Sequence, residues 1–374
     1  MADLSAVLAS LRRAPDVEAD NLTAVDASDR LILAEADAAL AEVDGDRVAV
    51  VGDRYGALTL GAAAAHGLTG IRVHQDPITG EQATARNAAR LDLDSVYRNH
   101  DLDEALLRGA RVVLLQLPRG LAELTEIAEA VARWADPAVT VYSAGRLKHM
   151  SRSMNDVLAR SFGEVAATRA AQKSRGLIAR GPVRTDPPTF PARTTVPELE
   201  LTVVAHGAVF AGGALDVGTR VLLRHVDRVA PDARRIVDLG CGTGLLAIAA
   251  ARARPDATVV ASDRSAAAVA SARATADLAG VTLTVRREDA LADEPDAGVD
   301  VVLCNPPFHE HTAVHTGGAE KLVRAAARVL RPGGEMWTVY NGHLHYRGLL
   351  ARTVGPTEIV DRTPKFVVTR SVRV

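Results

Sequence analysis

The chain has 374 residues, of which 48% are hydrophobic and 24% charged, so it is long enough for two domains with separate cores. No stretch approaches the roughly 18 consecutive apolar residues of a membrane span, and the N-terminus has no basic start before an apolar run, as a secretory signal would. We therefore expect a cytoplasmic protein with no membrane partner. Its two cysteines, Cys241 and Cys304, are too few for a disulfide framework or a zinc cluster, and we expect them to be small buried residues.

The charge is unevenly distributed. A formal net charge of −2 is unfavourable for a nucleic-acid-binding protein as a whole, because phosphate contacts require Lys and Arg. Residues 143–193, however, contain ten basic and three acidic residues, so this stretch carries +7. Either a solvated helical face or a basic hinge between two domains, on which folded RNA could rest, explains it. The basic residues are Arg146, Lys148, Arg152, Arg160, Arg169, Lys173, Arg175, Arg180, Arg184 and Arg193.

Short apolar runs alternate with helical stretches in both halves of the chain. In the first half the runs predict strands at residues 47–51, 70–74, 111–117 and 139–143, with a helix over 121–135. The second half repeats the plan, with strands predicted at 235–239, 258–262, 282–285, 299–304 and 335–340. This alternation predicts α/β architecture with parallel, doubly wound sheets covered by helices on both faces, and the repetition suggests a duplication.

A proline-rich segment separates the halves. Gly181-Pro182 and the run from Asp186 to Pro191 disfavour helix and strand alike, because proline fixes φ and cannot donate to a ladder. We place the domain boundary near residue 190, which gives two tandem Rossmann-like domains over residues 1–190 and 191–374.

The first motif that carries chemistry is the run from Asp238 to Gly244, between a predicted strand and an Ala-rich helix. Glycines here let the backbone turn sharply and approach a ligand without a Cβ in the way. Dinucleotide enzymes use the same strand, loop and helix, so the glycines alone do not identify the ligand. Asp238 favours S-adenosylmethionine over a dinucleotide, because a carboxylate would repel a pyrophosphate but can bind the methionine ammonium of S-adenosylmethionine.

Two further carboxylates follow the next two strands. Asp263 closes the second strand, where it can accept hydrogen bonds from ribose hydroxyls, and Asp289 in Glu288-Asp289-Ala290 can accept from the adenine amine. Helix N-capping explains any one of these acids. Acids at three successive strand ends favour a site for S-adenosylmethionine.

The second motif is Asn305-Pro306-Pro307-Phe308, directly after the fourth strand and in the crevice where open α/β sheets bind ligands. An exocyclic aryl amine is a poor nucleophile, because its lone pair is delocalised into the ring. Hydrogen bonds from the amine to the Asn305 side-chain oxygen and the Pro306 carbonyl would aim that lone pair at a methyl group, and the prolines stiffen the turn. Phe308 is placed to stack on a flipped base.

Two neighbouring segments complete the expected site. The glycine-rich stretch 207–223, which includes Phe210, predicts a loop and helix that cover the methionine end of the cofactor. His309, His311 and His315 have the spacing of a metal site, but no cysteine or carboxylate cluster completes it and methyl transfer requires no metal. We expect no metal, and His309 to touch the substrate.

At these residues the sequence resembles the bacterial ribosomal-RNA guanine-N2 methyltransferases, the family of small-subunit methyltransferase C and large-subunit methyltransferase G. The shared features, in order, are residues 210–223, the loop 238–244, residues 305–309 and a closing strand at Lys365-Phe366. Members of this family have two tandem methyltransferase-like domains, of which only the second keeps the cofactor and catalytic motifs. The resemblance covers nearly the whole chain and is strongest from about residue 200 onward.

The first half departs from the family's active pattern as an inactive copy would. Residues 51–56 replace the three-glycine loop, and Gln116-Leu117-Pro118-Arg119 stands where the catalytic turn would be. The resemblance implies that this degenerate domain supports folding of the catalytic domain and holds RNA, and that the basic stretch contacts RNA.

The expected site follows from the motifs and the resemblance together. The catalytic residues are Asn305, Pro306, Pro307 and Phe308. The cofactor-binding residues are Phe210, Asp216, Gly218, Asp238, Gly240, Cys241, Gly242, Gly244, Asp263, Asp289, Ala290 and Asn305. The substrate-binding residues are Phe308, His309, Arg146, Lys148, Arg152, Lys173 and Arg175.

The expected reaction is transfer of a methyl group from S-adenosylmethionine to the N2 amine of a guanosine in ribosomal RNA, with the RNA or a ribosomal subunit as partner. Two alternatives stay open. Adenine-N6 and protein-glutamine methyltransferases use the same turn, although most carry Tyr at its last position. A non-catalytic RNA-binding assembly factor could keep a methyltransferase shell, but the intact acids and Asn305 argue against it. The motifs leave the target guanosine and the ribosomal subunit open.

Overall fold

The computed structural model describes residues 3–16, 18–19, 22–306 and 316–374, with the side chains of residues 316 and 317 excepted. The chain divides into two compact units, Met1–Pro191 and Ala192–Val374, called here the first and the second unit. Within the described part of the chain, no helix is long and apolar enough to cross a membrane.

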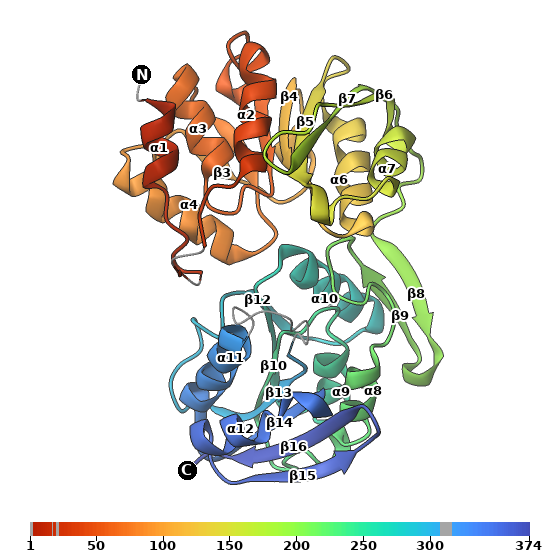
Figure 1. The fold of residues 1–374 in the computed structure, drawn as a ribbon. Coiled ribbons are helices and arrows are strands. Elements are labelled where there is room, and N and C mark those ends of the chain that lie inside the picture. Colours follow the sequence, from red (N-terminus) through yellow and green to blue (C-terminus); the bar gives the residue numbers. More distant parts are fainter. Residues whose placement is uncertain (1–2, 17, 20–21, 307–315) are drawn as a thin grey trace. The chain divides into compact units, whose positions relative to one another are not determined.

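The first unit is built on a seven-stranded sheet with the order β3-β2-β1-β4-β5-β7-β6 (Figure 1). The first five strands in this order run parallel, and β7 pairs antiparallel with both β5 and β6. The strands are β1 (Val48–Val51), β2 (Ile71–His74), β3 (Tyr97–Asn99), β4 (Val112–Gln116), β5 (Thr140–Arg146), β6 (Phe162–Ala167) and β7 (Ser174–Pro182).

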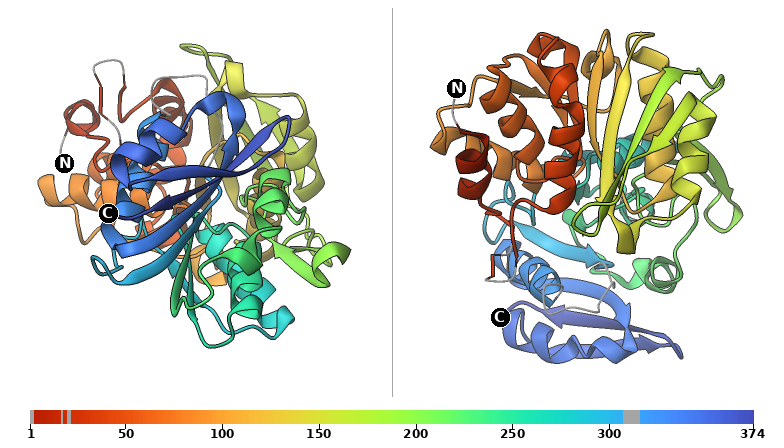
Figure 2. Two further views of the ribbon diagram at one scale, coloured as in Figure 1. Left: turned by 90° about the horizontal axis from the view of Figure 1, so that it is seen from below. Right: turned by 45° about the horizontal axis from the view of Figure 1, so that its top comes forward.

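Helices cover both faces of this sheet, as the views of Figures 1 and 2 agree. One apolar core lies between the sheet and α1 to α4, and the other between the sheet and α5 to α7. The central strands β1 and β4 are buried along their whole length, which is why they read as continuous apolar runs in the sequence. The helices are α1 (Leu4–Ser10), α2 (Ala27–Leu40), α3 (Ala57–His66), α4 (Ile78–Arg90), α5 (Glu104–Leu107), α6 (Leu121–Trp134) and α7 (Ser153–Ser161).

The second unit repeats this sheet in the order β12-β11-β10-β13-β14-β16-β15, again with five parallel strands and an antiparallel closing pair. A separate hairpin of β8 and β9 packs on α10. The strands are β8 (Ala192–Val196), β9 (Leu201–Ala205), β10 (Arg235–Leu239), β11 (Thr258–Asp263), β12 (Thr284–Arg287), β13 (Val299–Cys304), β14 (Leu330–Asn341), β15 (Thr357–Arg362) and β16 (Phe366–Val372).

The helices of the second unit also lie on both faces of their sheet (Figure 1). On one face α8 and α9 pack over a core that includes Trp337, and on the other face α11 and α12 cover a core that includes Tyr340. Both cysteines are buried in these cores, as expected. The helices are α8 (Val217–Leu223), α9 (Leu245–Ala253), α10 (Ala266–Ala279), α11 (Thr316–Val329) and α12 (Arg347–Thr353).

The predicted α/β class with two doubly wound, mostly parallel sheets is therefore confirmed. Two details were wrong. Much of the basic stretch is not a hinge, because β5, α7, β6 and β7 are all integral elements of the first unit. Pro182 was expected to lie outside any strand, but it is the last residue of β7, opposite Phe162. A proline at the end of a strand removes little of the ladder's hydrogen bonding.

Each unit contains a loop with the same backbone conformation after the first parallel strand of its sheet. In the first unit Gly52, Arg54 and Gly56 have positive φ, and in the second unit Gly240, Gly242 and Gly244 do, at the same spacing after the first parallel strand of the sheet. The N–H of Gly52 donates to the last residue of β2 at 2.9 Å, and the N–H of Gly240 donates to Ser262 in β11 at 2.8 Å. The same turn is thus built twice, once with three glycines and once with an arginine at its middle position.

Candidate functional site

The loop between β10 and α9 lies at the carboxyl edge of the second sheet. Gly240, Gly242 and Gly244 have φ values of 77°, 53° and 82°, a left-handed region that favours glycine. A Cβ added at Gly240 or Gly242 would meet nothing within 4 Å in the described part of the chain, so open space borders the loop there. At Gly244 a Cβ would lie 3.1 Å from that of Ala272, so this glycine serves the packing of α9 on α10. The loop therefore exposes backbone to a ligand at two of its three glycines.

Asp238 lies in β10 beside this loop and is 1% exposed. Its Oδ2 accepts from the N–H of Ala247 in α9 at 3.0 Å, while Oδ1 is buried with no hydrogen-bond partner among the described residues. Burial, together with the charge of Asp263, raises the pKa of Asp238 to about 7. A buried carboxylate with one open oxygen suits a cationic group, which would supply the missing partner.

Asp263 ends β11 and faces the same loop. Its Oδ2 accepts from the N–H of Gly242 at 3.1 Å, and its Oδ1 accepts from the N–H of Ser265 at 3.0 Å. Each carboxylate oxygen has more than one lone pair, so it can accept from a ligand hydroxyl as well as from the backbone. The carboxylate thus ties the loop to the second strand at a place where a ligand hydroxyl can reach it.

The third strand β12 leads to Glu288, Asp289 and Ala290. Asp289 pairs with Lys321 of α11, and Ala290 has a positive φ of 52°. Glu288 is the more buried acid, with Oε2 accepting from the N–H of Asp293 at 2.8 Å and Oε1 buried without a partner in the described chain. Sequence reasoning assigned the adenine contact to Asp289 and gave Glu288 no role. Both acids follow the end of β12, so the sequence could have suggested either one. The deeper burial of Glu288 in the structure distinguishes it from Asp289.

Asn305 follows β13 and is held from one side only. Its Nδ2 donates to Oδ2 of Asp216 at 3.0 Å and to Oγ1 of Thr219 at 2.9 Å. Its Oδ1 is buried and has no hydrogen-bond partner among the residues that the structure describes. The amide is thus oriented with its acceptor oxygen available, as recognition of an amine requires.

The partners of Asn305 come from the start of α8. Asp216 is the N-cap of this helix and accepts from the N–H of Thr219, which fixes both side chains relative to Asn305. A Cβ added at Gly218 would lie 3.2 Å from Oδ1 of Asn305, so glycine keeps this space open. Sequence reasoning assigned no role to Thr219, although its place three residues after the Asp216 N-cap was visible.

The remaining expected residues include two in the second unit, several outside the described residues and five basic residues in the first unit. Phe210 is 55% exposed in the segment before α8, and Cys241 is buried in the loop, where burial and the charges of Asp263 and Asp238 raise the pKa of its thiol well above the usual range. Pro307, Phe308 and His309 lie outside the described residues, as do His311 and His315. The basic residues expected to contact RNA all lie in the first unit, namely Arg146, Lys148, Arg152, Lys173 and Arg175.

Among the described residues, no group of three or more His, Cys, Asp and Glu side chains is placed to hold a metal ion. What the site brings together instead is a set of buried acceptors at the carboxyl edge of one sheet. Asp238, Glu288 and Asn305 each keep a buried oxygen without a partner in the described part of the chain. Such groups are costly to bury alone, and so they indicate a polar ligand with several donors.

Comparison with known proteins identifies each half separately. The family model described as "Methyltransferase small domain" matches residues 200–370, and the one described as "RLMG N-terminal domain" matches residues 2–183. A solved structure, the T. thermophilus 16S rRNA N2 G1207 methyltransferase in complex with AdoMet and guanosine, is 21% identical with a TM-score of 0.72. The match covers 93% of this chain and 92% of that one, and it shows a common fold.

Curated relatives extend over the full length. The ribosomal RNA large subunit methyltransferase G of Streptomyces avermitilis is 38% identical over 97% of both chains. The protein of the same name from Pseudomonas aeruginosa is 36% identical over 96% of both chains. These matches confirm the resemblance drawn from the motifs, and the chain belongs to the family of ribosomal RNA large subunit methyltransferase G.

Proposed function

We propose that this chain transfers a methyl group from S-adenosylmethionine to the exocyclic N2 amine of a guanosine in the ribosomal RNA of the large subunit. The observation that carries the proposal is the oriented amide of Asn305. Its nitrogen is held by Asp216 and Thr219, and its buried oxygen has no partner in the chain as described. A planar amine that donates to this oxygen completes the hydrogen bonding of the site.

The chemistry of the acceptor explains why such a group is needed. The lone pair of the N2 amine is delocalised into the guanine ring, so the amine attacks weakly unless its hydrogens are directed. A hydrogen bond from the amine to Oδ1 of Asn305, with a second to the carbonyl of Pro306, favours a tetrahedral nitrogen whose lone pair points away from both acceptors. The rigid turn supplies positioning, and the proton leaves late, so no group need remove it beforehand.

The same edge of the sheet suits the methyl donor. S-adenosylmethionine supplies an electrophilic methyl group on a sulfonium when bound. Asp238 offers its open oxygen to the positive charge of the methionine ammonium, and Asp263 offers carboxylate oxygens to ribose hydroxyls. Gly240 and Gly242 allow close approach of the loop. We keep Asp289 and Ala290 as candidate contacts to adenine, and Glu288 joins them because its buried Oε1 lacks a partner among the described residues.

The substrate class follows from the relatives, which carry the name of a methyltransferase of large-subunit ribosomal RNA, and from the T. thermophilus protein, whose complex holds AdoMet and guanosine. We propose that ribosomal RNA is the partner and that the chain acts in the cytoplasm, where that RNA is assembled. The first unit then contributes RNA contacts through its basic side chains rather than catalysis.

Methylation in vitro tests this assignment. Purified protein is incubated with labelled S-adenosylmethionine and deproteinised large-subunit RNA from a strain that lacks the gene, and the RNA is digested to nucleosides for mass spectrometry. We expect one N2-methylguanosine per RNA. Label in N6-methyladenosine would instead assign the turn to adenine, and an absence of cofactor binding in a titration would overturn the enzyme assignment altogether.

A further inference from the structure

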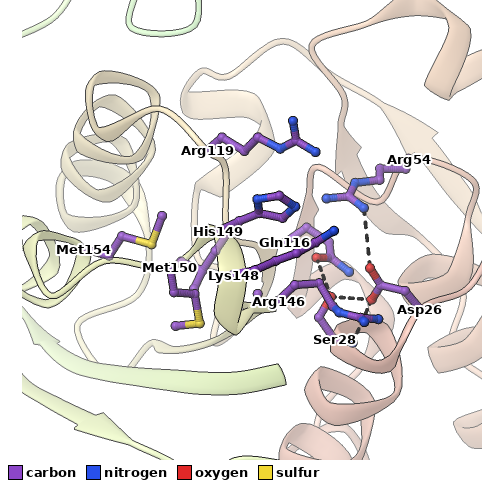
Figure 3. A pocket seen from close by; sticks show the side chains of 12 residues that line it. Asp26, Ser28, Arg54, Gln116, Arg119, Arg146, Lys148, His149, Met150 and Met154 are labelled. Atoms are coloured by element: carbon purple, nitrogen blue, oxygen red, sulfur yellow. Dashed lines mark hydrogen bonds and ion pairs between the residues drawn. The ribbon is translucent and has the colours of Figure 1, made fainter. Parts of the chain in front are cut away.

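The first unit contains a cavity of about 270 Å³ at the carboxyl edge of its own sheet, which Figure 3 shows from close by. Its three arginines come from the ends of three parallel strands, with Arg54 after β1, Arg119 after β4 and Arg146 at the end of β5. Doubly wound sheets bind their ligands at this edge. The cavity is lined by Asp26, Ser28, Arg54, Gln116, Leu117, Arg119, Gly145, Arg146, Lys148, His149, Met150 and Met154.

This cavity is the counterpart, within the first unit, of the site that the second unit builds around Asn305. Gln116 ends β4 and Asn305 comes directly after β13. Each stands one residue beyond the partner of the last residue of β1 or β10. Each amide nitrogen donates to the third residue of a helix that an aspartate caps, Asp29 of α2 for Gln116 and Thr219 of α8 for Asn305. The framework of a methyltransferase site is therefore retained.

The groups that would bind a cationic cofactor are lost from this framework. Val50 precedes the last residue of β1, as Asp238 precedes the last residue of β10, and Gln75 follows β2 where Asp263 ends β11. A hydroxyl also stands beside the amide oxygen, since Oγ of Ser28 lies 3.2 Å from Oε1 of Gln116, although its single hydrogen is shared with the nearer Oδ1 of Asp26. Ser28 takes the place of Gly218, which leaves the oxygen of Asn305 open. The first site therefore lacks acids at the positions of Asp238 and Asp263, and a hydroxyl stands beside its amide oxygen.

Two arginines occupy positions of the first unit that correspond to site positions of the second. Arg54 occupies the loop position of Gly242 and keeps its left-handed backbone, with φ of 61°. An arginine in this conformation is strained, and strain of this kind concentrates at functional positions. Arg119 comes three residues after Gln116, as Phe308 comes three residues after Asn305 in the sequence. The first substitution puts a guanidinium in the loop that the second unit leaves open beside its glycines, and the second puts one three residues after the amide.

The cations surround one another closely enough to act together. Figure 3 shows the side chain of His149 between those of Arg119, Lys148 and Arg54. Loss of solvent lowers the pKa of His149, and so do the positive charges of Arg119, Lys148, Arg54 and Arg146. Among the described residues that line the cavity, Asp26 is the one carboxylate, and it forms an ion pair with Arg54 at 3.7 Å. Two buried acids lie nearby, and burial raises the pKa of Asp29 to about 7 and the pKa of Asp53 to about 6, while the charge of Arg54 lowers both. Even with both acids ionised, four cationic side chains stand against these three carboxylates, which leaves positive charge that an anion would neutralise.

We propose that this cavity binds a phosphate-bearing nucleotide of the RNA substrate, so that the degenerate site has changed from a cation pocket into an anion pocket. Arginines bind the phosphate oxygens, with geometry suited to bidentate pairing. Leu117, Met150 and Met154 supply apolar lining against which the sugar or base can lie, and Figure 3 shows the two methionines on one side of the cavity. A cavity of about 270 Å³ is small for a whole cofactor and fits part of one nucleotide.

The inference rests on the proposed RNA substrate, and binding measured without methylation keeps the two claims separable. We compare the full-length chain with Arg54→Gly and Arg119→Gln. The first variant removes the charge and restores the residue that suits a positive φ, so its melting temperature should be unchanged or higher. The matched control is Arg86→Gln, an exposed arginine in the middle of α4 outside the cavity lining.

Affinity for deproteinised large-subunit RNA and for guanosine 5′-monophosphate is measured over a range of salt concentrations, with guanosine as the uncharged probe. We expect each cavity variant to weaken RNA binding about tenfold and to make the salt dependence shallower by about 0.7 for each phosphate that the variant no longer neutralises, while affinity for S-adenosylmethionine stays unchanged. RNA binding and salt dependence equal to those of Arg86→Gln would overturn the proposal. Loss of monophosphate binding with RNA binding intact would also overturn it, because the pocket would then hold a free nucleotide.

Discussion

Nδ2 of Asn305 lies 3.0 Å from Oδ2 of Asp216, and this hydrogen bond decides which way the amide of Asn305 faces. A carboxylate only accepts, so it selects the NH₂ end of the amide, and Thr219 satisfies the other hydrogen at 2.9 Å. The oxygen is thereby left as an acceptor with no partner in the described chain. We propose that Asp216 acts on catalysis through Asn305, as a positioning residue.

Replacing Asn305 with alanine should abolish turnover while the cofactor still binds. The lost hydrogen bond is made with the substrate amine, so kcat should fall by at least about 100-fold, as for removal of a single oriented polar group from other active sites. Single-turnover methylation and calorimetric titration of S-adenosylmethionine check this. Equal loss of cofactor affinity would mean that Asn305 binds the cofactor and does not orient the amine.

A serine at position 218 should imitate the degenerate site. In the first unit the hydroxyl of Ser28 lies beside the amide oxygen of Gln116, and Gly218→Ser would place a hydroxyl beside the oxygen of Asn305 in the same manner. We expect about a tenfold greater loss of kcat than in Gly218→Ala, which adds the same Cβ without a hydroxyl, since one good hydrogen bond competes with the substrate amine. If the two variants lose activity equally, crowding and not occupancy of the oxygen is responsible.

Cofactor affinity should depend on pH through Asp238. Its pKa is raised to about 7 in the ligand-free protein, and a cationic ligand favours the ionised form. Affinity should therefore weaken as pH falls below 7, by up to about tenfold per pH unit, and binding at pH 6 should release a proton. Calorimetry at pH 6 in two buffers of different ionisation enthalpy detects that proton. Asp238→Asn should bind weakly, without proton release, and a wild-type protein that releases none would contradict the role of Asp238.

The same ionisation should affect the ligand-free fold. Because the folded pKa lies above the usual value of 3.8, ionising Asp238 opposes folding. The cost is absent below about pH 4 and is complete above about pH 7. Asp238→Asn should therefore melt higher than the wild type at pH 8, with the difference vanishing near pH 4. Thermal denaturation without cofactor at the two pH values tests this, and a constant difference would refute it.

A buried ion cluster should hold the second sheet together. Glu294 is fully buried and accepts from Arg235 of β10 at 2.7 Å and from Arg286 of β12 at 2.6 Å. Glu294→Ala leaves both arginines without this partner, and we expect a loss of about 3 kcal/mol in the free energy of unfolding. Glu320→Ala breaks an exposed pair with Arg324 and should cost less than about 0.5 kcal/mol. Urea denaturation measures the free energy of unfolding of both variants. Equal losses would show that the buried cluster contributes no more stability than the exposed pair.

Much of the fold could be predicted from the sequence, because strands buried on both faces give continuous apolar runs. Residues 235–239 and 299–304 were predicted as strands with the bounds that β10 and β13 have. Among the antiparallel strands, the one expected at Lys365-Phe366 overlaps the start of β16, whereas β6, β7, β8, β9 and β15 were missed. The predicted strand at 139–143 extends to Arg146 in the structure, and β6, β7 and β15 have mixed burial with charged residues, which leaves no clear period to read.

The sequence predicted which loops form the candidate site, but not which side chains contact one another within it. Asp238, Asp263 and Asn305 stand out because each lies within one residue of the carboxyl end of a parallel strand, and parallel strands end at a common edge. The roles of Thr219 and Glu288 depend on which side chain is buried and toward what it points, and no periodicity carries that information. The cationic cavity was hidden for the same reason, since Arg54, Arg119 and Arg146 are far apart in sequence and meet only when the strands align.

A deletion strain tests the central claim most directly. Primer extension and nucleoside mass spectrometry across the large-subunit ribosomal RNA should show one N2-methylguanosine lost on deletion of the gene. The mark should return with the wild-type gene and stay absent with Asn305→Ala expressed at the same level. If every N2-methylguanosine persists in the deletion strain, or if the Asn305→Ala gene restores the lost mark, methyl transfer to guanine N2 directed by Asn305 is contradicted.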